Sequence, residues 1–426
     1  MLGFGLALTL AVTLLFGLAP ALRASAVDPA RALKGGSDPH SRGRTMRVLI
    51  AIQVAFCFLV LFVAGLFTAT FDRLSHRPTG FFAERLLTLE TVTQRAEAPI
   101  YWDQVAEHLR AVPGVETVAL SKWPLLSNNS SNGFVSISGS PPDPVLAYFL
   151  SVSPGWIDAM KMRLIDGRDF RESDTSPGVA IVNQTFVKQY FHEGSPIGKQ
   201  FNRGLLGYQV VGIVRDASYR SMREPILPVA YVPIHSIDAK GAMQPMSDAT
   251  LTVRTSGPNP LAIASTLRRE VPAARPEFRV SNIRTVEELV SAQTVRERLL
   301  AMLALFFAIV ALLLAGIGLY GVLDYSVLQR RKEIGIRMAI GAQAGHIARG
   351  VTADVFLMVF AGALAGIALG FGSIRYIQTL LYEVKPGDPM MLAIPLLTIL
   401  TAALAAAVPA VIRAVRIDPV NSLRSE

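Results

Sequence analysis

The chain contains little of what most catalytic and metal-binding chemistry needs. Its 426 residues include a single cysteine, Cys57, which excludes an intrachain disulfide and a metal site built from several thiolates. The six histidines are scattered, and no two of them have the spacing of metal ligands on a helix. No nucleophile, base and orienting group converge in the sequence. We therefore expect a protein that is not an enzyme, with no catalytic residues, no metal site and no cofactor of its own.

Charge is also scarce, and it is missing altogether from long parts of the chain. Charged residues make up 17% of the sequence and apolar residues 51%. Five long apolar stretches contain no charged residue: Leu2–Leu22, Val48–Phe71, Leu299–Leu323, Val355–Ile374 and Pro389–Ile412. A run of about 20 apolar residues forms a helix long enough to cross the hydrocarbon core of a bilayer. The sequence therefore predicts an α-helical membrane protein with about five transmembrane helices.

Lysine and arginine indicate the orientation of these helices. The segments 23–47, 324–354 and 413–426 hold 14 of them in 70 residues, whereas 72–298 holds 25 in 227 residues. Short loops rich in basic residues stay in the cytoplasm. We expect these three segments inside and 72–298 outside, so the net charge of +9 requires no nucleic acid.

The first apolar stretch has a second interpretation. It resembles a secretory signal peptide with a cleavage site at residues 24–26. The basic residues Arg23, Arg31 and Lys34 follow the stretch rather than precede it. This order favours a transmembrane helix with its N-terminus outside.

Residues 72–298 have the mixed pattern of a folded α+β domain. Strand, helix and strand patterns follow one another over 86–120 and again over 249–283, which predicts two β-α-β units that pair into one layer. The region between them, about 145–245, has strand patterns of its own and predicts a second lobe inserted into the first. Ser153, followed by proline, predicts the N-cap of a short helix.

Two glycine-containing motifs resemble nucleotide sites but lack the required context. "GSPIGKQ" (194–200) has three residues between its glycines and glutamine after lysine, unlike a phosphate-binding loop. "GIGLYG" (316–321) lies inside an apolar stretch rather than at a strand-to-helix turn. Small residues there, and the glycines spaced four apart at Gly362, Gly366 and Gly370, predict close helix packing.

The segment "QRRKEIGIRMAIGA" (329–342) is short, charged and flanked by two apolar stretches. Helical spacing brings its charges together and places apolar side chains on one face, and Gly341 predicts a break before a second helix. The apolar face predicts either docking into a groove on a soluble partner or an anchor at the lipid surface. The residues we expect to contact a partner or to shape the loop are Arg331, Glu333, Ile334, Gly335, Arg337 and Gly341.

This segment resembles the cytoplasmic loop of the MacB/FtsX-type permeases of ABC transporters. The resemblance extends over nearly all of 48–426, and "KMRLIDGRDF", "VAIVNQTFVKQYF", "VVGIVRDA" and "IRAVRIDPVNSLRSE" follow in the order that the family has. The chain departs from the family at "PAVIRA" (409–414), where one basic residue is missing.

The resemblance implies four spans per permease unit and a large periplasmic core domain with an inserted lobe. It also implies that a separate cytoplasmic ATPase, which binds the ATP, contacts the loop between the second and third spans. We expect a second permease unit as partner, with a periplasmic protein as a further partner, in the bacterial cytoplasmic (inner) membrane. The expected function is efflux or mechanotransmission; the alternative is a membrane-anchored regulator that recruits a periplasmic cell-wall enzyme without transport. The cargo is not indicated.

A repeat links the two ends of the chain. "RASAVDPARALK" (23–34) and "RAVRIDPVNSLR" (413–424) share Arg, Ala, Asp, Pro and Leu at identical offsets, and each follows an apolar stretch. Residues 1–36 therefore resemble the end of a preceding permease unit, as in tandem-duplicated permeases. The expected organisation is helix 1–22, cytoplasmic linker 23–47, helix 48–71, periplasmic domain 72–298, helix 299–323, cytoplasmic coupling loop 324–354, helix 355–374, short periplasmic loop 375–388, helix 389–412 and cytoplasmic tail 413–426.

Overall fold

The computed structural model describes residues 39–137, 139–191, 195–329, 336, 340 and 344–415. These residues form two compact units. The helical unit contains the described residues up to Gly65, from Ala304 to Gln378 and from Lys385 onward, whereas the sheet domain contains 66–303 and 379–384. The predicted helix 1–22 lies outside the described residues.

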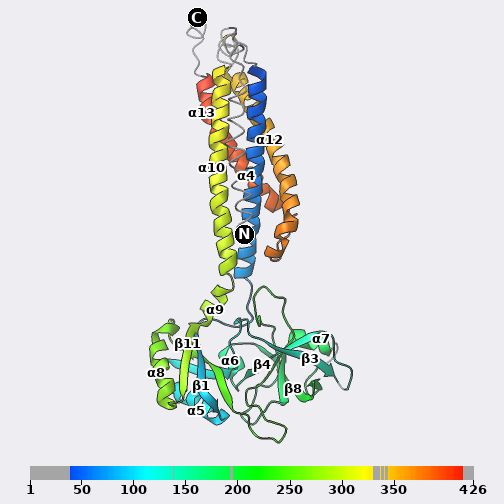
Figure 1. The fold of residues 1–426 in the computed structure, drawn as a ribbon, viewed down its shortest axis with the longest axis vertical. Helices are drawn as coiled ribbons and strands as arrows, with labels where there is room; N and C mark the ends of the chain where they lie inside the picture. The colour runs from blue at the N-terminus through cyan, green and yellow to red at the C-terminus, as the bar shows by residue number, and fades with distance from the viewer. Residues whose placement is uncertain are drawn as a thin grey trace. The chain divides into compact units, whose positions relative to one another are not determined.

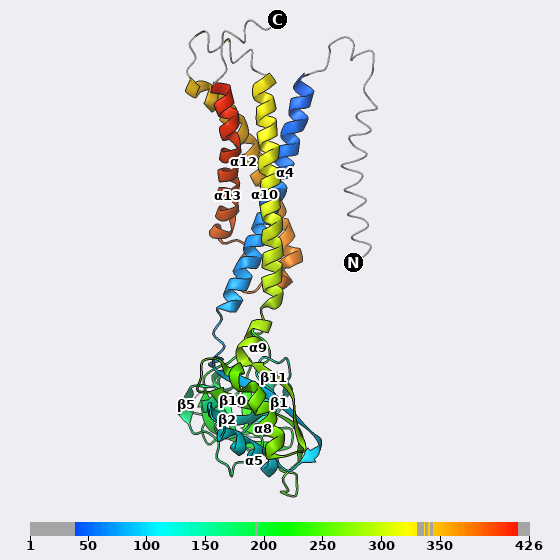
Figure 2. The same cartoon turned by 90° about the vertical axis from the view of Figure 1, so that its left-hand side faces the viewer.

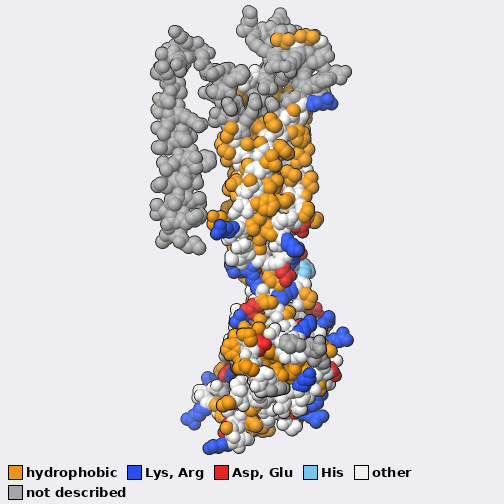
Figure 3. All heavy atoms as spheres, turned by 90° about the vertical axis from the view of Figure 1, so that its right-hand side faces the viewer, with side chains coloured by type: hydrophobic (Ala, Val, Ile, Leu, Met, Phe, Trp, Pro, Cys, Tyr) orange, Lys and Arg blue, Asp and Glu red, His pale blue; other side chains and the backbone are white. Residues whose placement is uncertain are grey.

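Four helices in the described part of the chain are long and apolar enough to cross a membrane (Figure 2). They are α4 (Pro39–Ser75), α10 (Val295–Gln329), α12 (Ala344–Ile377) and α13 (Pro389–Val415). The boundary between the two units falls inside α4 and inside α10. The side chains seen over these helices in Figure 3 are mostly hydrophobic, as contact with lipid requires.

The packing face of α13 consists mostly of small side chains. On α13, the buried side chains recur every three or four residues along one face; they are Ile399, Ala403, Ala407, Ala410 and Ala414. Because lipid tails are as apolar as leucine, helices in a membrane associate mainly through such close packing. α13 packs against α12, the spanning helix that precedes it in the chain.

The first lobe of the sheet domain is a four-stranded antiparallel sheet in the order β11-β1-β10-β2 (Figure 1). The strands are β1 (Leu86–Glu97), β2 (Val115–Ser121), β10 (Met246–Thr255) and β11 (Phe278–Thr285). Helices α5 (Pro99–Arg110) and α8 (Ala264–Ala274) pack on one face, where Trp102 of α5 meets Phe278 edge-on at 4.7 Å. The two predicted β-α-β units are confirmed, because each contributes two strands and one of these helices.

The second lobe is a ring of six strands. Its order is β4-β3-β7-β8-β6-β9, and a parallel pairing between β9 and β4 closes the ring. The strands are β3 (Ser131–Ile137), β4 (Leu146–Val152), β6 (Gly178–Asn183), β7 (Gln200–Arg203), β8 (Leu206–Val214) and β9 (Val229–Pro233), with β5 (Leu164–Gly167) paired to β8. Aromatic side chains fill its interior together with α7 (Gln184–Tyr190), which lays Phe186 against Phe201.

Two details of the second lobe differ from the sequence-based expectation. The ring begins at Ser131 rather than near residue 145, because β3 pairs with β4 and β7. The short helix α6 (Trp156–Ala159) is capped by Gly155, which has φ 76°, and not by Ser153. The Ser153 hydroxyl instead accepts a hydrogen bond from Leu120 N at 2.9 Å, so it joins the end of β4 to β2.

The sheet domain leads into α10 through α9 (Val286–Ala292), which begins with a capping box. Thr285 Oγ1 accepts from Glu288 N, and Glu288 Oε2 accepts from Thr285 N. Replacing Thr285 with alanine should destabilise α9 by about 1 kcal/mol, whereas Thr285→Ser should retain the cap. Hydrogen exchange of the α9 amides in the full chain measures this; equal exchange in the alanine and serine variants would contradict it.

Candidate functional site

The central part of the predicted partner-contacting loop lies outside the described residues. Arg331, Glu333, Ile334, Gly335, Arg337 and Gly341 all lie outside the described residues. Their role therefore stays a prediction. The flanking helices end at Gln329 and begin at Ala344, so both helices extend into the predicted coupling loop 324–354.

The three glycines on α12 face α4. A Cβ atom at Gly362 would lie 2.7 Å from Val54 Cβ, and one at Gly366 would lie 2.6 Å from Phe58 Cβ. At Gly370 the nearest atom would be a ring carbon of Phe62 at 3.1 Å. The two backbones approach so closely because glycine has no side chain at these positions.

A side-chain contact joins α10 to α4, and an ion pair joins α10 to α13. A Cβ at Gly318, within the 316–321 motif, would lie 2.6 Å from the Gln53 amide oxygen. Near the end of α10, Asp324 Oδ1 pairs with Arg413 Nη1 of α13 at 2.5 Å. Both contacts belong to the helical unit. The ion pair lies near the ends of α10 and α13, from which the predicted coupling loop and tail continue.

The sheet domain contains a buried ion pair that also reaches a distant segment. Arg223, after β8, places Nη1 3.1 Å from Glu297 Oε1, and the Glu297 side chain, near the start of α10, is only 4% exposed. Arg223 Nη2 donates to the carbonyl oxygens of Leu380 (2.7 Å) and Leu381 (3.3 Å). One guanidinium thus holds the start of α10 and the segment between α12 and α13.

Two more arginines hold the same segment, 379–384. Arg73, near the end of α4, donates to the Glu383 carbonyl oxygen. Arg77 lies 5.6 Å over the Tyr382 ring and donates to the Glu224 carbonyl oxygen at 2.8 Å. We call Arg73, Arg77, Arg223, Glu297 and segment 379–384 the arginine junction. It joins chain segments that lead to all four spanning helices.

The arginine junction holds segment 379–384 and the start of α10 in place, but its side chains do not form a catalytic site. Its donors are used on carbonyl oxygens and one carboxylate, and Glu297 Oε2 is buried without a partner among the described residues. Sequence analysis missed it, because Arg223 lies in an irregular segment, 74 residues before Glu297 and 157 before Leu380. No local pattern connects these positions.

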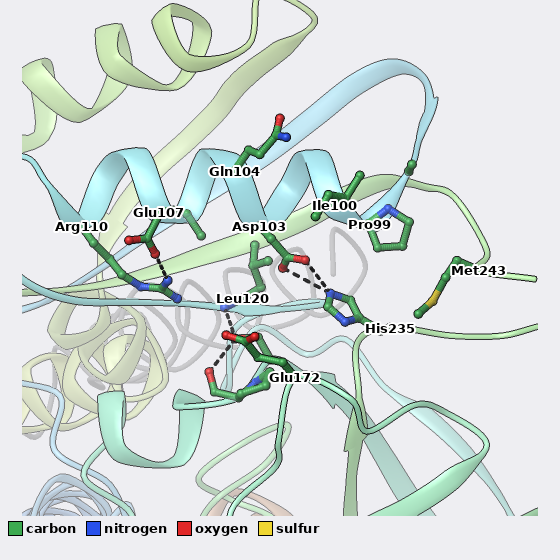
Figure 4. A pocket seen from close by; sticks show the side chains of 14 residues that line it. Pro99, Ile100, Asp103, Gln104, Glu107, Arg110, Leu120, Glu172, His235 and Met243 are labelled. Carbon is green, nitrogen blue, oxygen red and sulfur yellow. Dashed lines mark hydrogen bonds and ion pairs between the residues drawn. The ribbon is translucent and has the colours of Figure 1, made fainter.

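A pocket of about 590 Å³ lies between the two lobes of the sheet domain. Figure 4 shows α5 along one side, with His235 and Met243 from the segment between β9 and β10 facing it. His235 Nε2 lies 3.2 and 3.1 Å from the two carboxylate oxygens of Asp103. The hydrogen bond to Asp103 raises the pKa of His235 above its ordinary value, against the opposing effect of burial.

The ion pair across the pocket has a defined pH dependence. Because the pKa of His235 is raised in the folded state, its pairing with Asp103 stabilises the fold below the ordinary pKa of histidine. This contribution is lost as the pH rises through the raised value.

Among the described residues, no group of three or more His, Cys, Asp or Glu side chains has the geometry of a metal site.

Two family models match the chain. The model described as FtsX-like permease C-terminal matches residues 305–419, and the model described as MacB-like periplasmic core domain matches residues 48–270. The second match alone covers more than half of the chain. Together they cover most of the sheet domain and all or part of each of the four spanning helices, and leave out residues 271–304, which include β11, α9 and the start of α10.

The chain is also similar to two curated proteins and to one solved structure, at identities between 14% and 27%. The chain is 27% identical over 292 residues to the macrolide export ATP-binding/permease protein MacB 1/2 of Paracoccus denitrificans, which covers 65% of this chain and 42% of that protein. It is 23% identical to the uncharacterized ABC transporter permease YknZ of Bacillus subtilis, covering 65% of this chain and 69% of that protein. The periplasmic region of MacB from Actinobacillus actinomycetemcomitans aligns at 14% identity and a TM-score of 0.35, covering 52% of this chain and 97% of that one. The chain thus spans less than half the length of the MacB protein that it matches.

Proposed function

The chain belongs to the MacB/FtsX-type family of ABC transporter permeases, and from that premise we propose that it couples ATP hydrolysis on a separate ATPase to movement of its sheet domain. The permease role follows from the family. Coupling, and the use of that movement in efflux or mechanotransmission, is our proposal. The chain binds no ATP in this scheme, because the nucleotide is held by the partner subunit.

The arginine junction is the observation that carries this proposal. The sheet domain receives α4 and α10 directly, and Arg223 and Arg73 hold it to the segment that connects α12 to α13. Hydrogen bonds to charged donors are stronger than neutral ones. Covalent bonds or hydrogen bonds therefore connect each spanning helix to the sheet domain. Through these bonds, a shift of any spanning helix can move the sheet domain.

The proposed setting follows from the same premise. The four apolar helices fit a membrane protein, and we place it as a multi-pass protein of the bacterial inner membrane with the sheet domain in the periplasm. The ATPase contacts the coupling loop from the cytoplasm. A second permease unit completes the transporter, and a periplasmic protein is a further partner of the sheet domain.

The coupling loop provides the test of this function. Glu333→Ala should leave membrane insertion unchanged but weaken co-purification of the ATPase at least about ten-fold. The change leaves the charge that Glu333 pairs with unpaired at a buried interface, and this costs more than the ~1.4 kcal/mol that a factor of ten represents. Gly341→Leu should have a similar effect, because it prevents the break between the two predicted helices. The measurements are pull-down of the ATPase and its hydrolysis rate with each variant at equal expression.

The matched control is Glu116→Ala, which removes an exposed glutamate of β2 from the sheet domain. It should retain both assembly and hydrolysis. If Glu333→Ala and Gly341→Leu behave like this control, the loop is only an anchor at the lipid surface. Coupling through it is then wrong.

A further inference from the structure

The pocket between the lobes has the size and the walls of a small-molecule site. Its volume of about 590 Å³ lies within the range of roughly 300–1,000 Å³ that ligand pockets occupy. One wall is α5, from the first lobe. The other wall is formed by Glu172, between β5 and β6, and by His235 and Met243, after β9 (Figure 4).

We propose that this pocket binds a small organic cation with an apolar body. The proposal goes beyond coupling to an ATPase, since binding to the sheet domain requires no hydrolysis. Three observations support this proposal. Apolar side chains are exposed on both walls, carboxylates are in excess around the pocket, and a histidine is paired with one of those carboxylates.

The apolar walls account for the body of the ligand. Ile100 on α5 is 58% exposed and Met243 on the opposite wall is 51% exposed. Pro154, which is partly exposed, and Pro99, which is buried, also line the pocket. Large apolar side chains left open to water on both sides of one hollow are typical of a ligand-binding groove. Covering them with an apolar body removes both from water at once.

The charges account for the cation. The charge of Arg110 is paired with Glu107 at 2.5 Å, and Arg110 also donates to the Val118 carbonyl oxygen at 3.2 and 3.0 Å. Asp103 is held by His235. Glu172 has no hydrogen bond or ion pair within the described part of the chain, so the pocket keeps an uncompensated negative charge. An anion would be repelled from this site and a cation attracted to it.

His235 makes the affinity depend on pH. The charged groups that face it are Asp103 from α5 and Glu172 from the opposite segment. When His235 is protonated, it competes with the ligand for both carboxylates. When it loses its proton, the pocket gains a further net negative charge. Affinity for a cation whose own charge is fixed should therefore rise as the pH rises through the raised pKa of His235.

The test uses tetraphenylphosphonium, whose positive charge does not change with pH. Its binding to the full chain in nanodiscs is measured by equilibrium dialysis, with empty nanodiscs as the blank, between pH 5.5 and 8.5. We expect saturable binding that tightens with pH. Triphenylphosphine oxide, a neutral molecule with similar phenyl groups, should bind at least about five-fold more weakly, which is the factor that one partly exposed ion pair supplies.

Matched variants locate the binding. Glu172→Gln and Ile100→Ser should each weaken tetraphenylphosphonium binding about five-fold, and both positions are exposed, so folding is retained. His235→Gln should remove the pH dependence. The controls are Glu116→Gln and His108→Gln; His108 also sits on α5 and pairs with a glutamate, Glu270, at 2.8 Å, but does not line the pocket.

The outcomes separate this site from non-specific uptake. Equal binding by wild type, Glu172→Gln and Ile100→Ser would show partition into lipid and overturn the proposal. Equal binding of the neutral phosphine oxide would overturn the requirement for a cation. Loss of the pH dependence in His108→Gln rather than in His235→Gln would place the titrating group outside the pocket. None of these results depends on an ATPase, so the coupling proposal can fail while this one stands.

Discussion

Replacing Gly366 with leucine is expected to force α12 away from α4 and to destabilise the helical unit by about 3 kcal/mol or more, at the upper end of what overpacking costs. A Cβ atom alone would lie 2.6 Å from Phe58 Cβ and 2.9 Å from the Ala55 carbonyl oxygen. The carbonyl oxygen belongs to the backbone of α4 and cannot rotate away. The helices must therefore separate, and the close packing at Gly362 and Gly370 is lost with it.

Gly372 supplies the control on the same helix. A Cβ there meets nothing within 4 Å. Gly372→Leu therefore makes the same change in composition and helix propensity as Gly366→Leu, but without a clash. Thermal unfolding of each variant in the same detergent, followed by helical circular dichroism, compares them. Midpoints that fall equally in both variants, or in neither, would show that the crossing of α12 and α4 does not carry stability.

The glycine spacing shows how far sequence reasoning reaches in the helical unit. A repeat of four residues predicted a contact face on one helix, because i and i+4 lie on the same side. It gave no indication of which helix would cover that face. The partner, α4, lies about 300 residues earlier in the chain, and the contact there is made by Val54, Phe58 and Ala55, which resemble any other residues of an apolar helix.

The sheet domain divides in the same way. The first lobe was predictable because each β-α-β unit is local and buries alternate residues of its strands against a neighbouring helix. The closure of the second lobe was not, since β9 pairs in parallel with β4 across about 80 residues. The polar sequence that begins β3 resembles a turn, and only its pairing with β4 and β7 makes Ser131 part of a strand. Tertiary pairing there overrides the local pattern.

The candidate sites are less predictable than the fold because their residues come from unrelated segments. Arg223 and Glu297 are ordinary charged residues in the sequence, and only burial makes them a pair. The same holds for His235 and Asp103, which are 132 residues apart. Charge in a sequence usually indicates a solvated surface. The exceptions are set by the tertiary structure.

Arg223→Met is expected to release segment 379–384 and to destabilise the sheet domain by roughly 3–5 kcal/mol, the cost of breaking a buried ion pair from one side. The change leaves the Glu297 carboxylate buried without its partner and frees the carbonyl oxygens of Leu380 and Leu381. Hydrogen exchange of the amides of 379–384 in the full chain should accelerate at least about ten-fold. Under the coupling that we propose, this variant should also no longer transmit movement between the spanning helices and the sheet domain.

A double variant separates loss of stability from loss of the connection. In Arg223→Met with Glu297→Leu, both charges are replaced by apolar side chains, which commonly restores or exceeds the original stability. The two carbonyl oxygens nevertheless remain without their donor. We therefore expect the unfolding midpoint to recover while exchange in 379–384 stays fast. Glu116→Gln, which breaks the exposed pair with Arg85, should change stability by less than about 1 kcal/mol. Recovery of slow exchange in the double variant would show that Arg223 does not hold the segment, and the junction would then be a structural ion pair alone.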